Sequence, residues 1–408
     1  MKYLRVAVLF SLLFTCSCTS HKGPVRMQVW HQMQPTDRAV LERAVKTWEA
    51  RHPGASVTVL YKETEELRTT FQTAALAGLG PELIFGPSDQ VGPLAIMGFI
   101  QPMEPFFTDE ELAEFDTACL VHSHGHLFQV ADRIGNHLTL IYNKRLLAEP
   151  PKDSDELIRV GKELTKDFNG DGRIDQWALV WNYTEPFFFI PFLGGFGGWI
   201  MDEEGKPTLN TPEAVAAFEF VKFLRDSARM IPPESDYNSA DVLFKEGRAA
   251  MLINGPWSWG GYAKAGVDFG LARIPKITKT GLWPSPMVSP VGYSINSNTK
   301  GQRLELAVEL LKYLLSTEVE LEYVKASSVI PSKLSARKDS IFMRNPWMAG
   351  AVAQLEVGRL MPIVPELRAI WDAMRPSYQL VLSGTISPAL AARRMQNEAV
   401  RKIREINE

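Results

Sequence analysis

The sequence contains little cysteine: three residues among 408. Two of them, Cys16 and Cys18, directly follow a short apolar segment at the amino terminus. If that segment is removed or modified on export, Cys119 stands alone, and the mature protein contains no disulfide. A fold that depends on a disulfide scaffold is therefore excluded.

A surplus of positive charge is also missing. Lys and Arg number 44 against 47 for Asp and Glu, which gives a formal net charge of -3. Nucleic-acid-binding domains usually carry a basic surplus, so nucleic acid is not an expected partner. The remaining composition, 45% hydrophobic and 22% charged, is typical of a globular protein, and the length favours two domains.

The amino-terminal apolar run is too short to cross a membrane. Residues 6–14 are apolar and follow two basic residues, whereas a membrane-spanning helix needs ~20 residues. The pattern predicts a secretory signal peptide within residues 1–24. Ser17 before Cys18 resembles a bacterial lipobox, although Thr15 replaces the usual aliphatic residue. We expect export to the periplasm or cell surface with lipid on Cys18, and ordinary cleavage nearby is the alternative.

Strand and helix patterns alternate after the signal segment. This β-α-β-α-β order is typical of a mostly parallel sheet that is covered by helices on both faces. Further along the chain, His124-Gly125 indicates a hairpin, and Ser387 followed by Pro388 predicts the start of a last helix. Strands are expected at 26–30, 56–61, 82–85, 138–142 and 292–295, and helices at 36–52, 65–77 and 304–315.

The most informative segment is Asn254 to Trp259, where two indole rings lie beside a Gly-Pro turn. An aromatic ring at the mouth of a cleft can hold the apolar face of a sugar ring. With Asp236-Tyr237-Asn238 before it, the segment resembles the corresponding run of maltose-binding-type extracellular solute-binding proteins (family 1), the receptors of carbohydrate ABC transporters. The resemblance recurs, in the same order, at 140–144, at 184–188 and at Met361-Pro362 followed by Trp371.

The resemblance implies an α/β, two-lobed periplasmic-binding-protein fold of type II (Venus-flytrap), in which ligand binds between lobes that hinge shut. The chain would cross between the lobes three times, near 134–137, 290–292 and 339–343. Lobe 1 would then comprise residues 25–134 plus 293–339, and lobe 2 residues 137–290 plus 342–408.

Four positions keep residues that suit sugar contacts in the family. Asp89, at the carboxyl end of a strand, and Glu185 would accept hydrogen bonds from hydroxyls, and Trp257 and Trp371 would stack on sugar rings. Capping of the next helix is the alternative for Asp89, and packing in the core is the alternative for Trp371.

Other positions depart from the family pattern. An Asp-Lys pair is replaced by Gln34-Pro35, a cleft tryptophan by Gly86, an arginine by Gln90, a glutamate by Asn136 and a tyrosine by Phe187. Amides still bond hydroxyls, so a polyol ligand is compatible with these changes, although maltose itself is less so. Charges at Asp132, Arg133, Asp372 and Arg375 either rebuild specificity or form a solvated face. The expected ligand-binding residues are Gln34, Asp89, Gln90, Asn136, Glu185, Phe187, Trp257, Trp371 and Arg375.

One loop resembles a calcium-binding loop. Asp167, Asn169, Asp171 and Asp175 stand at ligand positions one, three, five and nine, but Ala178 replaces the bidentate acid at position twelve. A weak calcium site and an ordinary polar loop are both compatible with this pattern. No cofactor is otherwise required.

The family resemblance favours a non-catalytic, monomeric lipoprotein that delivers a carbohydrate, with an oligosaccharide as one candidate, to an ABC permease. The membrane would be contacted only through the lipid anchor. One alternative is a secreted glycosidase or lyase that uses Glu185 with Asp89 or Asp372 as its carboxylate pair. Another is a sensory sugar receptor of the same fold.

Overall fold

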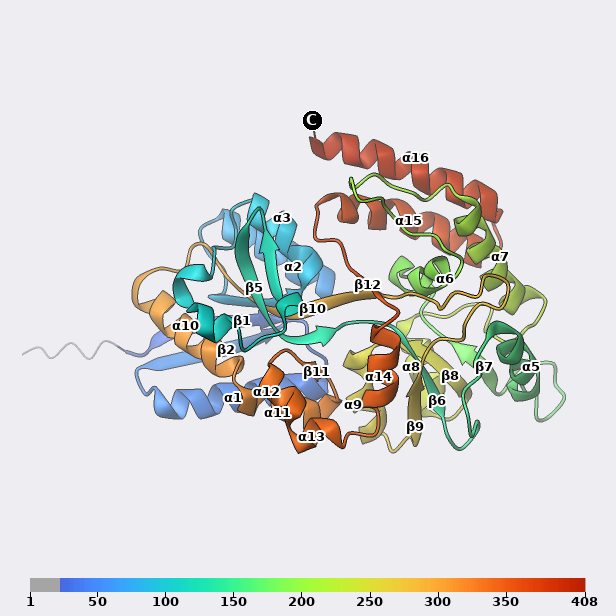
Figure 1. Cartoon of the computed structure of the whole chain (residues 1–408), viewed down its shortest axis with the longest axis horizontal. Helices are drawn as coiled ribbons and strands as arrows, with labels where there is room; N and C mark the ends of the chain where they lie inside the picture. Colours follow the sequence, from blue (N-terminus) through green and yellow to red (C-terminus); the bar gives the residue numbers. More distant parts are fainter. Residues whose placement is uncertain (1–22, 408) are drawn as a thin grey trace, which may run out of the picture.

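The computed structural model describes residues 23–407 and contains two mixed sheets flanked by helices (Figure 1). We call the eight-stranded sheet with its helices lobe 1 and the four-stranded sheet with its helices lobe 2. The expected two-lobed α/β fold is confirmed. The signal segment and Cys18 lie outside the described residues. No helix within the described part of the chain is both long and apolar enough to cross a bilayer.

Lobe 1 begins with the predicted alternation. Strand β1 pairs in parallel with both β2 and β3. The first helix has Pro35 at its start and ends just before Pro53, which cannot continue a helix. These elements are β1 (Val25–His31), α1 (Pro35–Arg51), β2 (Ala55–Tyr61), α2 (Thr64–Leu76) and β3 (Leu83–Pro87).

The other strands of lobe 1 make its sheet mixed, so the expectation of a mostly parallel sheet is wrong beyond β3. The reason is that β10 returns from lobe 2 and runs antiparallel between β3 and β5. The hairpin at His124-Gly125 is confirmed, with both residues at positive φ. The added strands are β4 (Leu120–Ser123), β5 (His126–Gly135), β10 (Met287–Ile295) and β11 (Ile330–Pro331), and the main order is β11-β5-β10-β3-β1-β2. The remaining strand of the sheet, β12 (Arg359–Leu360), pairs with Met287 and Val288 at the start of β10 and lies between the lobes (Figure 1).

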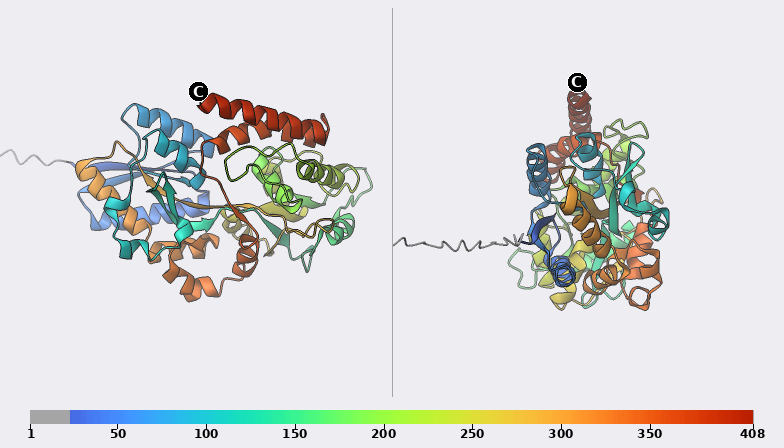
Figure 2. Two further views of the ribbon diagram at one scale, coloured as in Figure 1. Left: turned by 45° about the horizontal axis from the view of Figure 1, so that its top comes forward. Right: turned by 90° about the vertical axis from the view of Figure 1, so that its left-hand side faces the viewer.

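Lobe 2 contains the strand order β7-β8-β6-β9, in which only β7 and β8 are parallel. Helices α7, α15 and α16 lie together over one side of this lobe (Figure 2). Its strands are β6 (Thr139–Asn143), β7 (Trp177–Val180), β8 (Ala249–Asn254) and β9 (Phe269–Ala272), and its helices include α5 (Ser154–Leu164), α6 (Ile190–Gly195), α7 (Pro212–Asp226), α8 (Tyr237–Lys245), α9 (Pro256–Lys264), α14 (Met348–Leu355), α15 (Glu366–Leu382) and α16 (Pro388–Asn407).

The chain passes between the sheets at three places. It leaves β5 at Gly135 and enters β6 at Thr139, and it returns along β10, where Ser289 pairs with Gly135. The third passage lies between α13, which packs on α11, and α14, which packs on β9, slightly later than expected. The exact lobe bounds stay a prediction. The remaining helices are α3 (Val91–Ile96), α4 (Asp109–Leu112), α10 (Gly301–Leu314), α11 (Thr317–Ser327), α12 (Leu334–Lys338) and α13 (Ser340–Met343).

One apolar core extends from lobe 1 into lobe 2. It includes Val29 of β1, Ile141 of β6 and the fully buried ring of Trp259 on α9. Helix α9 lies against α1 and α11. The approach is close: a Cβ on Gly260 would stand 2.7 Å from the carbonyl oxygen of Ala326. The lobes are therefore joined by packing as well as by the three crossings.

Asp132 and Arg133 are buried, so a solvated face is the wrong interpretation for this pair. The Arg133 guanidinium donates to Asp37 of α1 at 2.6 Å and to both carboxylate oxygens of Asp132 at 2.7 and 2.9 Å. It also lies over the ring of Tyr323 on α11, 4.2 Å from its centroid. Burial alone would lower the pKa of Arg133, but the two carboxylates raise it well above its usual range.

Replacing Arg133 should strongly destabilise the protein. In Arg133→Ala, two buried carboxylates lose their partner, and breaking such an arrangement costs about 3 kcal/mol or more. We expect a matching loss in the free energy of unfolding by urea titration. The control is Arg159→Ala, because Arg159 forms exposed pairs on α5. Equal stability of the two variants would contradict this role of Arg133.

Candidate functional site

Three aromatic residues from distant parts of the sequence meet in lobe 2. The ring of Phe187 lies 6.4 Å from that of Trp257 and 6.4 Å from that of Trp371, at interplanar angles of 48° and 69°. Phe187 and Trp257 are half-buried, whereas Trp371 is buried. The structure thus brings together three of the predicted ligand-binding residues, and Trp371 also packs in the apolar core of lobe 2.

The Gly-Pro turn explains how the Trp257 ring is placed. A Cβ on Gly255 would lie 2.0 Å from the indole, so only glycine lets the ring lie back over the chain. Pro256 starts α9, and the Ser258 hydroxyl donates to the Gly255 carbonyl at 2.7 Å. The two indoles of the motif therefore differ in role, because Trp259 belongs to the core shared by the lobes.

Tyr237, at the start of α8, is a further residue of this site that was not predicted individually. Burial raises the pKa of its hydroxyl to about 12, while hydrogen bonding with Asn254 and Trp257 opposes that shift. The signal was present in the sequence, since Asp236-Tyr237-Asn238 belongs to the segment that carries the family resemblance.

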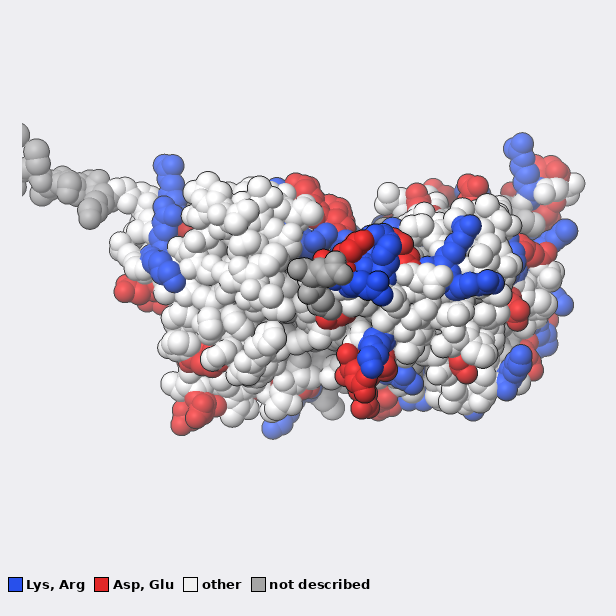
Figure 3. Space-filling view, turned by 90° about the horizontal axis from the view of Figure 1, so that it is seen from above, with Lys and Arg blue, Asp and Glu red and all other residues white. Residues whose placement is uncertain are grey.

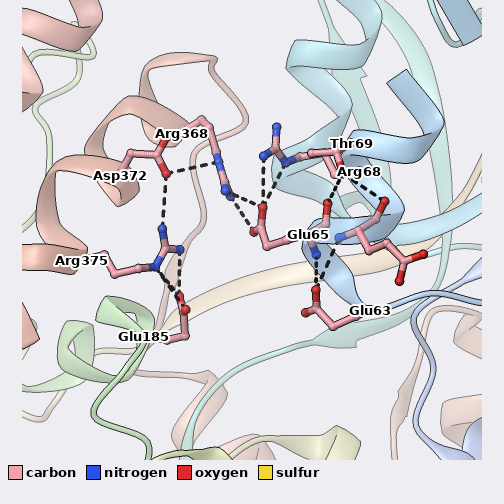
Figure 4. A network of polar contacts seen from close by, with 9 residues as sticks. Glu63, Glu65, Arg68, Thr69, Glu185, Arg368, Asp372 and Arg375 are labelled. Carbon is pink, nitrogen blue, oxygen red and sulfur yellow. Dashed lines mark hydrogen bonds and ion pairs between the residues drawn. The ribbon is translucent and has the colours of Figure 1, made fainter. Parts of the chain in front are cut away.

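Glu185 lies beside Arg375 of α15 (Figure 4). The guanidinium donates from Nη2 at 3.0 Å and from Nε at 3.2 and 3.3 Å to the carboxylate. Arg375 also donates to Asp372 at 3.4 Å. Although burial acts to lower the pKa of Arg375, Glu185 and Asp372 raise it above its usual range. These charges form pairs with one another instead of a solvated face.

Asp89 follows β3, as predicted, in the short helical turn 88–90. It is half-buried, and its Oδ1 atom is buried with no hydrogen-bond partner in the described chain. Burial raises the pKa of Asp89 to about 6, and the charge of Arg368 opposes the shift. His31 Nε2, at the end of β1, and Gln32 Oε1, directly after it, are also buried with no hydrogen-bond partner among residues 23–407. Since an unpaired buried polar atom costs about 1–3 kcal/mol, this edge of the sheet favours a polar ligand.

The positions that depart from the family pattern differ from one another in their surroundings. Gln90 is buried, and its amide lies beside Gly86, where a Cβ would be 3.1 Å from Gln90 Oε1. The side chain of Gln90 therefore occupies space that the missing tryptophan leaves. Gln34 is half-buried at the start of α1. Asn136 donates to the Ser289 hydroxyl at 3.0 Å and thereby links two of the crossings.

Two surface cavities, of about 620 and 480 Å³, contain no predicted ligand residue. The first is lined mainly by apolar side chains, including Leu112, Phe115, Leu120 and Leu334. The second surrounds the start of β1 with Arg26, Lys300 and Arg303. Neither cavity includes Phe187, Trp257 or Trp371, so neither changes the choice of site.

The carboxylates of the candidate calcium loop accept backbone hydrogen bonds within the loop. Asp167 accepts from Gly170 and Gly172 at 2.7 and 2.8 Å, and Asp175 accepts from Phe168 at 2.8 Å. Among residues 23–407, no group of three or more His, Cys, Asp or Glu side chains is arranged to hold a metal ion. The polar-loop alternative fits this geometry better, and calcium binding stays a prediction.

Chelation separates the two alternatives. A bound calcium ion would make the melting temperature fall on addition of EDTA, and Asp171→Ala would abolish that fall. Because the loop is closed by its own amides, we expect identical melting curves with and without EDTA. A reproducible fall that disappears in Asp171→Ala would establish the calcium site instead.

Two lobes joined by three crossings, with aromatic rings on one and unpaired polar atoms on the other, define a solute-binding protein. Residues 43–350 match the family model for bacterial extracellular solute-binding proteins, and the chain belongs to this family.

Individual relatives agree with this assignment. The chain is 49% identical to the maltose/maltodextrin-binding domain MalE from Bdellovibrio bacteriovorus bound to maltotriose, with a TM-score of 0.90 over 93% of this chain and 100% of that chain. The Thermus thermophilus maltotriose-binding protein is 26% identical, with a TM-score of 0.84 over 92% and 100%. The maltotriose-binding protein of Pyrococcus abyssi is 27% identical over 368 residues, which cover 88% of this chain and 78% of the relative.

Proposed function

We propose that this protein is the substrate-binding component of an ABC-type sugar importer and that it holds a short maltodextrin between its lobes. The observation that carries the proposal is the aromatic group of Phe187, Trp257 and Trp371 together with the unpaired polar atoms of His31 and Asp89. The solved structures described above, which contain maltotriose, support this ligand class.

The chemistry of a sugar ring suits these groups. Its apolar face stacks on an aromatic ring, and its rim of hydroxyls both donates and accepts hydrogen bonds. Asp89 and Glu185 would accept from hydroxyls, and the ligand would touch both lobes when they close. Only interactions that form on closure can supply the free energy that shifts the lobes to the closed state.

A glycosidase is the second candidate, because the raised pKa of Asp89, about 6, would suit a general acid. The other carboxylate would have to be Glu185, which is already paired with Arg375. The similar proteins named above are binding proteins, which also favours binding without turnover. Release of shorter sugars from maltotriose would revive the enzyme.

Trp257 is the residue whose replacement should weaken sugar binding most. Stacking and apolar burial of an aromatic ring together amount to roughly 2 kcal/mol. In calorimetric titration with maltotriose we therefore expect Trp257→Ala to bind more than tenfold more weakly while its melting curve stays close to that of the wild type. Glu185→Gln should also bind more weakly, because it loses charge-assisted hydrogen bonds.

The matched control is Glu398→Gln, which replaces a carboxylate that pairs with Arg401 on α16. It should bind like the wild type. If Trp257→Ala retains full affinity, or loses it only by unfolding, the indole serves packing and the proposed site is wrong.

The protein belongs to an extracellular family, and one similar protein is the solute-binding lipoprotein of the maltooligosaccharide ABC transporter of Streptococcus pneumoniae. We infer that this chain is likewise anchored by lipid at Cys18 and delivers sugar to a membrane permease. Cys18→Ser should move the protein from the membrane fraction to the soluble exported fraction, as judged by immunoblotting. A variant that remains with the membranes would rule out this anchor.

A further inference from the structure

A bidentate ion pair joins the lobes beside the proposed sugar site. Glu65 lies in the first turn of α2 in lobe 1, and Arg368 lies on α15 in lobe 2. Arg368 Nη1 donates to Glu65 Oε1 at 2.8 Å, and Nη2 donates to Oε2 (Figure 4). Arg68, one turn along α2, donates to the same carboxylate at 3.1 Å. The contact therefore has the parallel geometry that favours arginine with carboxylate.

The network continues from this pair to the predicted ligand residue Glu185. Arg368 Nε stands 3.7 Å from Asp372 Oδ1, and the same oxygen stands 3.4 Å from Arg375 Nη1. Arg375 then pairs with Glu185 at 3.0 Å. Charges alternate along the whole path from α2 to Glu185. On the face seen in Figure 3, oppositely charged side chains gather where the two lobes meet.

The charge of the same guanidinium also acts on the other predicted ligand carboxylate, Asp89. After burial, the charge of Arg368 is the strongest influence on the pKa of Asp89. Burial acts to raise the pKa of Glu65 too, but hydrogen bonds and charge from Arg368, with Arg68, lower it overall. The lowered pKa favours the ionised form of Glu65, which the ion pair with Arg368 requires.

The backbones of the two lobes also touch here. A Cβ on Gly92, in α3 of lobe 1, would lie 1.7 Å from the carbonyl oxygen of Ile363, which precedes α15. No side chain fits between these segments. The ion pair therefore lies at an edge where α2 and α3 rest against the segment 363–368.

We propose that Glu65 and Arg368 are positioning residues that hold the lobes closed over the ligand, and that Asp372 and Arg375 connect this contact to Glu185. The inference rests on the proposed sugar-binding function and adds to it residues that favour closure. A domain opening would return both partners to water. The ion pair thus favours the closed state, and its free energy adds to the affinity for any ligand that requires closure.

The expected contribution is modest. Exposed ion pairs are weak, whereas two-pronged arginine-carboxylate pairs that are half-buried are stronger. The side chains of Glu65 and Arg368 are 45% and 26% exposed. Breaking the pair should therefore weaken sugar binding about twofold to tenfold. Because neither residue needs to contact the sugar, the same factor should apply to sugars of different length.

The experiment is calorimetric titration of Glu65→Gln, Arg368→Gln and the double variant with maltose and with maltotriose. Each single variant should bind both sugars more weakly by one common factor, and the double variant should be no weaker than the weaker single. High salt should lower the sugar affinity of the wild type toward that of the variants, and it should change the affinity of the variants little. The variants lie in different lobes, so misfolding of one leaves the other informative.

The matched control is Lys312→Gln, which breaks a bridge of similar exposure to Glu111 within lobe 1. It should bind both sugars like the wild type. If the wild type binds sugar and the two single variants and the double variant all match its affinity, the positioning role is wrong. A loss for only one of the two sugars would also overturn it, by indicating direct ligand contact. If the wild type binds neither sugar, the proposed function itself fails.

Discussion

A single buried guanidinium, that of Arg133, fixes the part of lobe 1 on which the hinge depends. It ties the end of β5 to α1 through Asp37 and to α11 through the ring of Tyr323. Those two helices form the surface against which α9 of lobe 2 packs. Trp257 lies in the first turn of α9, so its position relative to lobe 1 depends on this buried charge. A polar interaction deep in one lobe thereby helps to place an aromatic ring of the other.

The lobes meet through two interfaces of opposite character. Near the crossings, the contact is apolar and close, with Trp259 fully buried and no room for a side chain at Gly260. At the other edge, half-exposed charges centred on Glu65 and Arg368 lie beside the close backbone contact of Gly92 with Ile363. Apolar burial is costly to undo, whereas ion pairs near water exchange easily for hydration. In the proposed closure, this difference would let the first interface act as a pivot while the second opens and closes.

Local patterns in the sequence predicted the first three strands and their helices, because periodicity and turn chemistry act over short distances. The candidate aromatic ligand residues were predicted from the family resemblance. Interactions between distant segments could not be predicted in this way. Arg133 and Asp37 are 96 positions apart, so nothing near Arg133 indicated burial. The antiparallel return of β10 and the different roles of Trp257 and Trp259 likewise depend on which lobe each segment meets.

One face of α15 carries both a residue that contacts lobe 1 and residues of the candidate site. Arg368, Trp371 with Asp372, and Arg375 are spaced at intervals of three and four residues, so they follow one stripe of the helix. One residue of the stripe pairs with lobe 1, one joins the aromatic group, and one binds Glu185. Any rotation of lobe 2 that moves Trp371 relative to a ligand must also move Arg368 relative to Glu65. The proposed contact with the ligand and the contact between the lobes would therefore be coupled through a single helix.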